Sequence, residues 1–297
     1  HQVAIVWLRR ALRLADNPAL AHALEAADAV VVLAEAGGSL APGAASRAWR
    51  ARSLAALDAS LRALGTRLAV REEASADTLP ALAAECGATL VCFDLAFEPA
   101  AAAADAAMVA ALKATGISAS GFNCALLNAP DGPRATGDGP FRVFTPYYNA
   151  CLRLGSPEPP VPAPVRIPAP AAMPAGLDPA AIPGADAHPL GAWWTPGEAG
   201  ALAAAERFVA EALEAYPEHH DRPDLVGTSR LSPHLACGEI SPRQVVGVLG
   251  GAAVGSPAER GPSPDAAAAF ARQLYWREFA YHTLRHFPES TERPLQG

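Results

Sequence analysis

The first 122 residues alternate short apolar runs, rich in β-branched side chains, with longer stretches whose apolar residues recur at helical spacing. Short runs of this kind are typical of strands that are buried on both faces of a parallel sheet. Strands that alternate with helices imply right-handed crossovers, so this part is predicted to be α/β. The predicted strands are residues 3–8, 30–33, 68–70, 89–93 and 117–122.

The stretches between these strands carry helix start and stop signals. Asn17 and Pro18 fit an N-cap and a first helical residue, because an N-cap side chain accepts a backbone N–H and proline lacks one. A helix over residues 46–64 is expected to end at Gly65, and further helices are expected over residues 78–86 and 100–115. The prediction is a Rossmann-like, doubly wound parallel sheet, and such sheets bind ligands beyond the C-terminal ends of their strands.

The pattern changes in the second half. Eleven prolines lie between Pro157 and Pro189, too many for a helix or a central strand, so we expect a stiff connector wrapped over the surface. Helical spacing returns in residues 198–216 and 265–286, and Ser241 followed by Pro242 is typical of another helix start.

These elements predict three parts: an α/β domain over residues 1–130, a proline-rich interdomain linker over residues 131–195, and the first part of an all-helical domain over residues 196–297. The helical part stops at Gly297, soon after its third long helix, and about 100 helical residues make a small core. We therefore expect this chain to be the beginning of a longer protein.

Composition excludes several classes of protein. Hydrophobic residues make up 51% of the chain and charged residues 18%, which excludes a disordered chain. The net charge of −7 does not indicate nucleic-acid binding, whose footprint is usually basic. No apolar run is long enough to cross a bilayer, so no membrane contact is expected. The five cysteines are widely spaced without a C-x-x-C pair, which favours a reducing cytoplasm over a disulfide framework or a metal site.

The run Gly-Thr-Ser-Arg-Leu-Ser-Pro at residues 227–233 has the composition of a phosphate-binding turn. Gly227 permits a tight bend, three hydroxyls follow it, and Ser232 fits an N-cap followed by proline. A helix N-terminus with hydroxyls and an arginine nearby suits a phosphate group. The alternative is ordinary capping of a surface helix.

A second informative stretch covers residues 270–282. On a helix, Phe270, Gln273, Tyr281 and either Trp276 or Arg277 share one face. A face that combines aromatic, amide and guanidinium groups is costly to bury unless it lines a polar aromatic ligand. The alternative is an aromatic core stripe with a satisfied arginine.

Three motifs in order identify a family. The chain carries Gly-Thr-Ser-Arg-Leu-Ser-Pro-His-Leu from residue 227, Gly-Glu-Ile-Ser-Pro-Arg-Gln from residue 238 and Trp-Arg-Glu-Phe from residue 276. Together they closely resemble the flavin-binding half of the DNA photolyase/cryptochrome family. Residues 6–20 are similar to the family's opening strand and helix, and residues 141–148 to the segment before its interdomain linker.

The resemblance implies a U-shaped FAD within the helical domain. The residues implied to hold its phosphates are Tyr216, Thr228, Ser229, Arg230, Leu231 and Ser232. Those implied to line the flavin cavity are Phe270, Gln273 and Arg277. Substrate DNA is implied to contact His220, Gln273 and Trp276, with the Trp276 ring stacking on a flipped lesion.

The implied activity is that of a deoxyribodipyrimidine photolyase, a carbon–carbon lyase acting on UV-damaged DNA. Reduced FAD supplies an electron in light, the pyrimidine dimer splits, and the electron returns. The family also implies an antenna chromophore of the folate or deazaflavin type in the α/β domain, with contacts expected near residues 97–99 and 122–123. We expect a cytoplasmic monomer.

The family's remaining FAD contacts and its tryptophan electron relay follow the point at which this chain stops. No catalytic residue is therefore expected within the chain, which alone is expected to bind FAD weakly and to repair no DNA.

Three departures keep other functions open. Gln273 stands where many cyclobutane-dimer photolyases have glutamate, whereas six-four photolyases and animal cryptochromes have glutamine. His220 stands where many relatives have an arginine that touches DNA phosphate. Ala11 replaces a frequent aspartate of the opening motif. A cryptochrome-type blue-light flavoprotein and a six-four photolyase are the alternatives, and a bare nucleotide-binding α/β module is a third.

Overall fold

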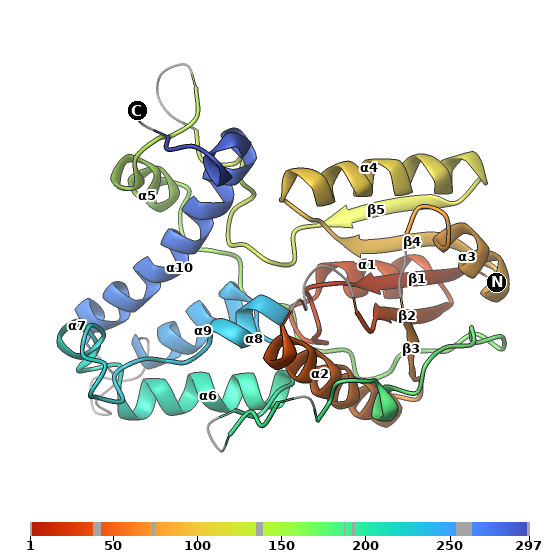
Figure 1. Ribbon diagram of the computed structural model, residues 1–297, viewed down its shortest axis with the longest axis horizontal. Helices are drawn as coiled ribbons and strands as arrows, with labels where there is room; N and C mark the ends of the chain where they lie inside the picture. Colours follow the sequence, from red (N-terminus) through yellow and green to blue (C-terminus); the bar gives the residue numbers. More distant parts are fainter. Residues whose placement is uncertain are drawn as a thin grey trace.

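A computed structural model describes residues 2–37, 43–72, 75–134, 139–186, 188–191, 194–253 and 263–295. A five-stranded sheet flanked by helices forms one side of the molecule, and helices without strands form the other (Figure 1). The α/β prediction is therefore confirmed.

The sheet is parallel throughout. Its order is β3-β2-β1-β4-β5, with β1 at the centre and Val6 paired to both Val32 and Cys92. The five predicted strands are confirmed with small shifts at their ends: β1 (Val3–Leu8), β2 (Ala29–Glu35), β3 (Leu68–Arg71), β4 (Ala88–Asp94) and β5 (Ser118–Phe122).

Helices cover both faces of the sheet because successive residues of a strand point to opposite sides. Val6 packs in the core under α1 (Pro18–Ala26) and α2 (Ala44–Ala63). Its neighbour Ile5 packs in the core under α3 (Leu79–Cys86) and α4 (Pro99–Ala114). Asn17 caps α1 by accepting from Leu20 N at 3.1 Å, as predicted.

Beyond the sheet, α5 (Phe144–Arg153) lies within residues 131–195, which were predicted to form the linker, and no helix was predicted at this position. Pro146 lies in the first turn, where a missing N–H costs nothing. Aromatic packing holds this helix: the Phe144 ring stacks on Trp276 with 3.6 Å between centroids, and Tyr148 meets Tyr275 edge-on at 5.2 Å.

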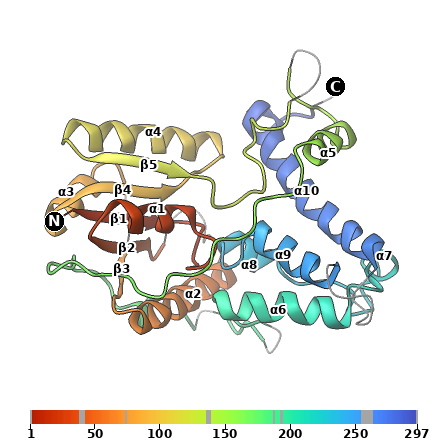
Figure 2. The ribbon, with the colours of Figure 1, turned by 180° about the vertical axis from the view of Figure 1, so that it is seen from behind.

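The proline-rich connector crosses the α/β surface after α5, with one short 3₁₀ turn, η1 (Pro179–Ala181) (Figure 2). Its backbone hydrogen-bonds to the domain beneath. Val30 N donates to Pro168 O at 2.8 Å, and Leu177 N donates to Val70 O of β3 at 2.8 Å. The connector is thus fixed along its length.

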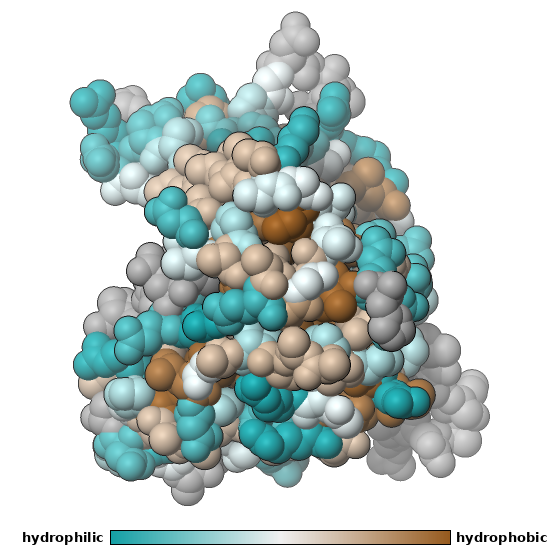
Figure 3. All heavy atoms as spheres, turned by 90° about the vertical axis from the view of Figure 1, so that its right-hand side faces the viewer, coloured by the Kyte–Doolittle hydropathy of each residue, from teal (hydrophilic) through white to brown (hydrophobic). Residues whose placement is uncertain are grey.

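On the side of the molecule formed by the α/β part, strongly hydrophobic and hydrophilic residues are interspersed (Figure 3).

The helical part contains α6 (Glu198–Glu211), α7 (Tyr216–His219), α8 (Ser232–Cys237), α9 (Pro242–Ala253) and α10 (Pro264–His286), followed by the 3₁₀ turn η2 (Pro288–Thr291). The prediction of one helix over residues 198–216 is wrong. The N–H groups of Ala212 and Leu213 both bond to Phe208 O, which ends α6. The chain then turns so that Tyr216 packs edge-on against Phe208 at 5.6 Å.

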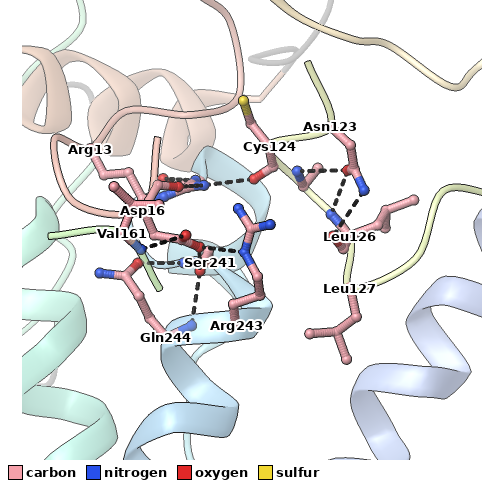
Figure 4. Close-up of polar contacts among 12 residues, drawn as sticks. Arg13, Asp16, Asn123, Cys124, Leu126, Leu127, Val161, Ser241, Arg243 and Gln244 are labelled. Carbon is pink, nitrogen blue, oxygen red and sulfur yellow. Dashed lines mark hydrogen bonds and ion pairs between the residues drawn. The ribbon is translucent and has the colours of Figure 1, made fainter. Parts of the chain in front are cut away.

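The two halves meet around Asp16, a buried residue with φ of +50° (Figure 4). Its carboxylate accepts from Ser241 Oγ at 2.5 Å and from Arg243 Nε at 3.0 Å. Ser241 also caps α9, because its Oγ accepts from Gln244 N at 2.9 Å while Gln244 Oε1 accepts from Ser241 N at 2.8 Å. The predicted N-cap is confirmed, and it is a complete capping box.

Arg13 and Gly238 complete this junction. The fully buried Arg13 guanidinium donates to the carbonyls of Gly238 and Cys124 at 2.9 and 2.8 Å. Gly238 follows α8 at φ +66°, and a Cβ there would overlap the Arg10 carbonyl oxygen. Only glycine allows the helical part to approach the α/β part so closely.

Candidate functional site

A cleft of about 700 Å³ opens between α10 and the turn that leads into α8. All nine residues that the sequence predicted to hold FAD lie on its walls. The lining residues are Tyr216, Thr228, Ser229, Arg230, Leu231, Ser232, Leu235, Ala236, Phe270, Gln273, Leu274, Arg277, Ala280 and Tyr281. Two segments distant in sequence are thus brought to one site.

The turn at residues 227–232 forms one wall. A Cβ on Gly227 would lie 2.6 Å from His219 Cβ and 2.7 Å from His219 O, so only glycine fits the bend. Arg230 has φ of +55°, a strained conformation for a residue with a side chain. Leu231 is buried in the helical core and anchors the turn.

The predicted N-cap role of Ser232 is wrong. Ser232 is the first residue of α8, and Leu231 occupies the cap position without a side-chain cap hydrogen bond. α8 has only six residues. The Ser232 hydroxyl is therefore not used to satisfy its own helix, and it lines the cleft instead.

The opposite wall is one face of α10. Phe270 is buried against Phe208 and Tyr216, with ring centroids at 4.5 and 5.2 Å, so the aromatic wall is rigid. Farther along the helix, Arg277 Nη1 donates to Ala125 O at 2.7 Å, and the guanidinium lies 5.2 Å from the centroid of the Tyr281 ring.

The charge of the cleft differs from that of the chain. Arg230 and Arg277 line it, and no Asp or Glu is among the described lining residues, although the chain carries a net charge of −7. Burial raises the pKa of the Tyr216 hydroxyl, which stays neutral. The cleft is a local positive site between an aromatic wall and a row of hydroxyls.

Two residues predicted to contact DNA lie outside the cleft walls. The Trp276 ring stacks on Phe144 of α5 and is 45% exposed. Arg277 lines the cleft, whereas Trp276 is not among its described lining residues. The expectation that Trp276 contacts DNA stays a prediction.

His220 is likewise outside the cleft walls. Its ring stacks on Tyr216 at 4.9 Å, and its Nδ1 lies 2.9 Å from Tyr216 O. Of the three predicted DNA contacts, only Gln273 lines the cleft.

A second cavity of about 520 Å³ lies between α2, the connector and α8. Trp49 and Trp194 both line it, with their rings edge-on and their centroids 5.6 Å apart. The Trp49 indole N–H donates to Glu239 at 3.0 Å, and His234 Nδ1 lies 2.5 Å from the same carboxylate. The walls are Arg10, Ala45, Ser46, Trp49, Arg50, His188, Leu190, Trp194, Pro233, Ala236, Cys237 and Tyr281.

Sequence reasoning missed this cavity, because its walls come from separate segments that carry no common motif. The only local signal is Trp49-Arg50, a large aromatic residue beside an arginine in an alanine-rich helix.

A third cavity, of about 80 Å³, lies at the C-terminal edge of the sheet. The Asp94 carboxylate accepts from the backbone N–H groups of Arg9 and Arg10 at 3.0 and 2.7 Å, so the chain itself occupies the crevice between β1 and β4. Phe97 and Glu98, near which antenna contacts were expected, line it. Asn123 instead holds a turn by accepting from Leu126 N at 3.0 Å.

In the described part of the chain, no group of three or more His, Cys, Asp and Glu side chains is placed to hold a metal ion. In the same ranges, no helix combines the length and hydropathy needed to cross a bilayer.

Comparisons with known proteins show the family to which the chain is similar. The family model described as DNA photolyase matches residues 4–165. A deoxyribodipyrimidine photo-lyase of Agrobacterium fabrum is 35% identical over 97% of this chain and 60% of its own length. Cryptochrome-1 of Arabidopsis thaliana is 32% identical over 99% of this chain and 45% of its own.

A solved class III photolyase from Agrobacterium tumefaciens superimposes with a TM-score of 0.87 at 35% identity, covering 98% of this chain and 61% of that one. This chain thus spans less than two thirds of these relatives. It belongs to the DNA photolyase family, whose relatives found here include cryptochromes.

Proposed function

We propose that the cleft between α10 and the 227–232 turn binds FAD. One observation carries the proposal: nine residues from two separate segments line a single cleft of about 700 Å³. Ligand cavities of cofactor size commonly span about 300–1,000 Å³. The donor set also fits, because hydroxyls and arginines suit a diphosphate whereas an aromatic wall suits a flat ring system.

Each group has a distinct role in this proposal. Thr228, Ser229 and Ser232 donate hydroxyl hydrogen bonds to phosphate oxygens, and Arg230 neutralises their charge. Phe270 supplies an aromatic wall for the cofactor, and Gln273 offers an amide to the rings or to a lesion. The guanidinium groups of Arg230 and Arg277 in the cleft lining attract the dianionic diphosphate by Coulomb interaction.

We further propose that the protein of natural length is a deoxyribodipyrimidine photolyase of the cytoplasm, acting as a monomer on UV-damaged DNA. The name carried by the Agrobacterium fabrum relative supports this proposal. The bound flavin would supply light-driven electron transfer. The residues of this chain bind and orient it, with residues 1–130 as the antenna unit, residues 131–195 as the linker, and residues 196–297 as part of the FAD unit.

A blue-light signalling flavoprotein or a six-four photolyase is the second candidate. Gln273 favours it, because the amide lines the cleft where a carboxylate would add negative charge. The similarity to cryptochrome-1 supports keeping it.

The larger second cavity is the proposed antenna site. Its volume of about 520 Å³ suits a chromophore of folate or deazaflavin size, whereas the sheet-edge cavity of about 80 Å³ does not. Trp49 and Trp194 offer stacking surfaces, and Arg10 and Arg50 offer positive charge to an anionic tail.

FAD binding tests the first proposal in protein of natural length. Changing Thr228 and Ser232 together to alanine removes two hydroxyls from the cleft, and we expect FAD affinity to fall by about tenfold or more. The matched control changes Ser60 and Thr115, hydroxyl residues on α2 and at the end of α4, to alanine. An unchanged affinity in the cleft variant would contradict the proposal.

Repair is tested separately. Oligonucleotides that carry one cyclobutane dimer or one six-four product are illuminated with blue light in the presence of the natural-length protein. Loss of the cyclobutane dimer supports the leading proposal and loss of the six-four product the second. Bound flavin without loss of either lesion favours the signalling function.

A further inference from the structure

Residues 123–128, here called the strap, join the two halves of the molecule beside the cleft. Arg13 of the α/β part donates to Cys124 O at 2.8 Å, and Asn123 shapes the strap by accepting from Leu126 N at 3.0 Å (Figure 4). Arg277 of the cleft donates to Ala125 O at 2.7 Å. The strap therefore sets where the Arg277 guanidinium lies.

The residue after Arg277 holds the same strap. Glu278 is 1% exposed, and its carboxylate accepts from Leu127 N, from Asn128 N at 3.2 Å and from Asn128 Nδ2 at 3.1 Å. Two successive residues of α10 thus hydrogen-bond to the strap: Arg277, which lines the cleft, and Glu278, which is buried in the core. Ala125 also lines the sheet-edge cavity, so its hydrogen bond with Arg277 links a residue of that cavity to a residue of the cleft.

Burial raises the pKa of Glu278 to about 7, although the strap donors favour the ionised carboxylate. The titratable groups that interact electrostatically with Glu278 come from two helices: Tyr275 and Arg277 of α10, and Tyr147 and Cys151 of α5. His282 follows about one turn later on α10. Asp131 lies beyond the strap and pairs with His286 at 3.2 Å.

The tyrosine and cysteine neighbours and His282 are uncharged near neutral pH. Burial raises the pKa of Tyr275 to about 12 and that of Cys151 to about 11. Burial lowers the pKa of His282, whose Nδ1 lies 2.8 Å from Pro130 O while its Nε2 accepts from Phe141 N at 3.1 Å. Glu278 is the group of this cluster whose charge changes close to pH 7.

We propose that Glu278 is a positioning residue of the flavin cleft: its ionised carboxylate clamps the strap to α10 and so fixes the Ala125–Arg277 contact at the cleft wall. A proton on the carboxyl turns one acceptor oxygen into a donor that faces the N–H groups of Leu127 and Asn128. The clamp then loosens. The inference rests on the proposed function, because FAD is the ligand that reports on the cleft.

The test measures the FAD dissociation constant of natural-length protein between about pH 6 and about pH 8, a range that brackets the titration. Wild-type protein is expected to bind FAD about three- to tenfold more weakly at the acidic end, as for the loss of one hydrogen bond. Glu278→Gln mimics the protonated acid, so its affinity is expected to be low and independent of pH.

Glu198→Gln is the matched control. Glu198 is also a carboxylate held by two backbone donors, Leu14 N and Ala15 N, each at 2.8 Å, and it lines no part of the cleft. This variant is expected to keep the wild-type pH dependence. The proposal would be overturned if the FAD affinity of Glu278→Gln changed with pH as steeply as that of wild type.

Two additional measurements cover other outcomes. If wild-type protein binds no FAD at any pH, the proposed function fails, and the amide resonances of Leu127 and Asn128 then decide the inference. The chemical shifts of both amides must change together across the same pH range. Chemical shifts that do not change with pH overturn the inference about Glu278. If Glu278→Gln does not fold, Asn128→Ala keeps the carboxyl and removes one donor. The pH at the midpoint of its titration must be higher than in wild type, because the remaining donors stabilise the ionised carboxylate less. An unchanged midpoint pH overturns the proposal.

Discussion

The hydroxyl of Ser241 donates a 2.5 Å hydrogen bond to the carboxylate of Asp16, 225 residues earlier in the chain. The same hydroxyl caps α9, so one side chain both starts a helix of the helical part and fixes that helix to the α/β part. Interdomain docking and local folding are therefore coupled at Asp16.

Asp16→Ala is expected to destabilise the protein by about 3 kcal/mol, because it leaves a buried hydroxyl and the Arg243 guanidinium without their shared acceptor. Alanine also tolerates φ of +50° poorly. The urea midpoint of the first unfolding transition measures the change. Asp77→Ala, at an exposed loop position, is the control and should leave the midpoint in place.

Gly238→Ala should be more damaging than an ordinary glycine replacement. The new methyl group would overlap Arg10 O, and φ is +66°, so the two halves must separate or the turn must rebuild. We expect a loss of at least about 3 kcal/mol.

Gly247→Ala on α9 is the comparison for Gly238. Its Cβ would meet Pro160 at 3.7 Å, an ordinary contact, and alanine favours helices by about 1 kcal/mol over glycine. Thermal unfolding should show a lower Tm for Gly238→Ala and an equal or higher Tm for Gly247→Ala. Equal effects of the two would contradict the close approach at residue 238.

The pH dependence of stability has a defined sign at Glu278. Its pKa is about 7 in the folded state, above its usual value of 4.5, so the folded protein binds the proton more tightly than the unfolded chain. Stability should therefore fall as pH rises from about 4.5 to about 7, by up to about 3 kcal/mol, and then level off.

The measurement is the difference between wild type and Glu278→Gln, which cancels the other titrating groups. The stability of wild type relative to the variant should decline over that window. A difference that is constant with pH would contradict the raised pKa.

Two aromatic residues of α10 are expected to differ sharply on truncation. Phe270 is 6% exposed and packs against Phe208 and Tyr216, so Phe270→Ala should cost about 3–5 kcal/mol. Trp276 is 45% exposed and stacks on Phe144, so Trp276→Ala should cost about 1 kcal/mol. Urea unfolding followed by far-UV circular dichroism compares them. Equal costs would show that the Trp276 contact is stronger than its burial indicates.

Strands β1 to β4 were predictable because burial on both faces demands apolar runs such as Val3–Leu8. Elements held by tertiary contacts were not. α5 depends on rings of α10, and α6 ends because Tyr216 folds back onto Phe208 rather than at a stop residue. The helical periodicity of the sequence alone predicts neither the presence of α5 nor the end of α6.

In the cleft, too, some features were predictable from the sequence and others depend on tertiary contacts. The sequence motifs predicted the nine residues that line the cleft. Their spacing left open whether Trp276 or Arg277 faces the cleft. Packing against Phe144 decides between them. The Trp49 cavity was invisible because helix, connector and turn each contribute a few residues, and none of these is informative without the others.

The connector's hydrogen bond from Leu177 N to Val70 O has a consequence for solubility. β3 is the outermost strand on its side of the sheet, and a bare outer strand is a template for pairing with another chain. The backbone of the proline-rich segment lies along β3 and uses a hydrogen-bond acceptor of this strand that a neighbouring molecule could otherwise bond. Proline has no N–H, so the prolines of this segment cannot donate hydrogen bonds to a further strand. A segment whose evident task is to join two halves also guards the sheet against self-association.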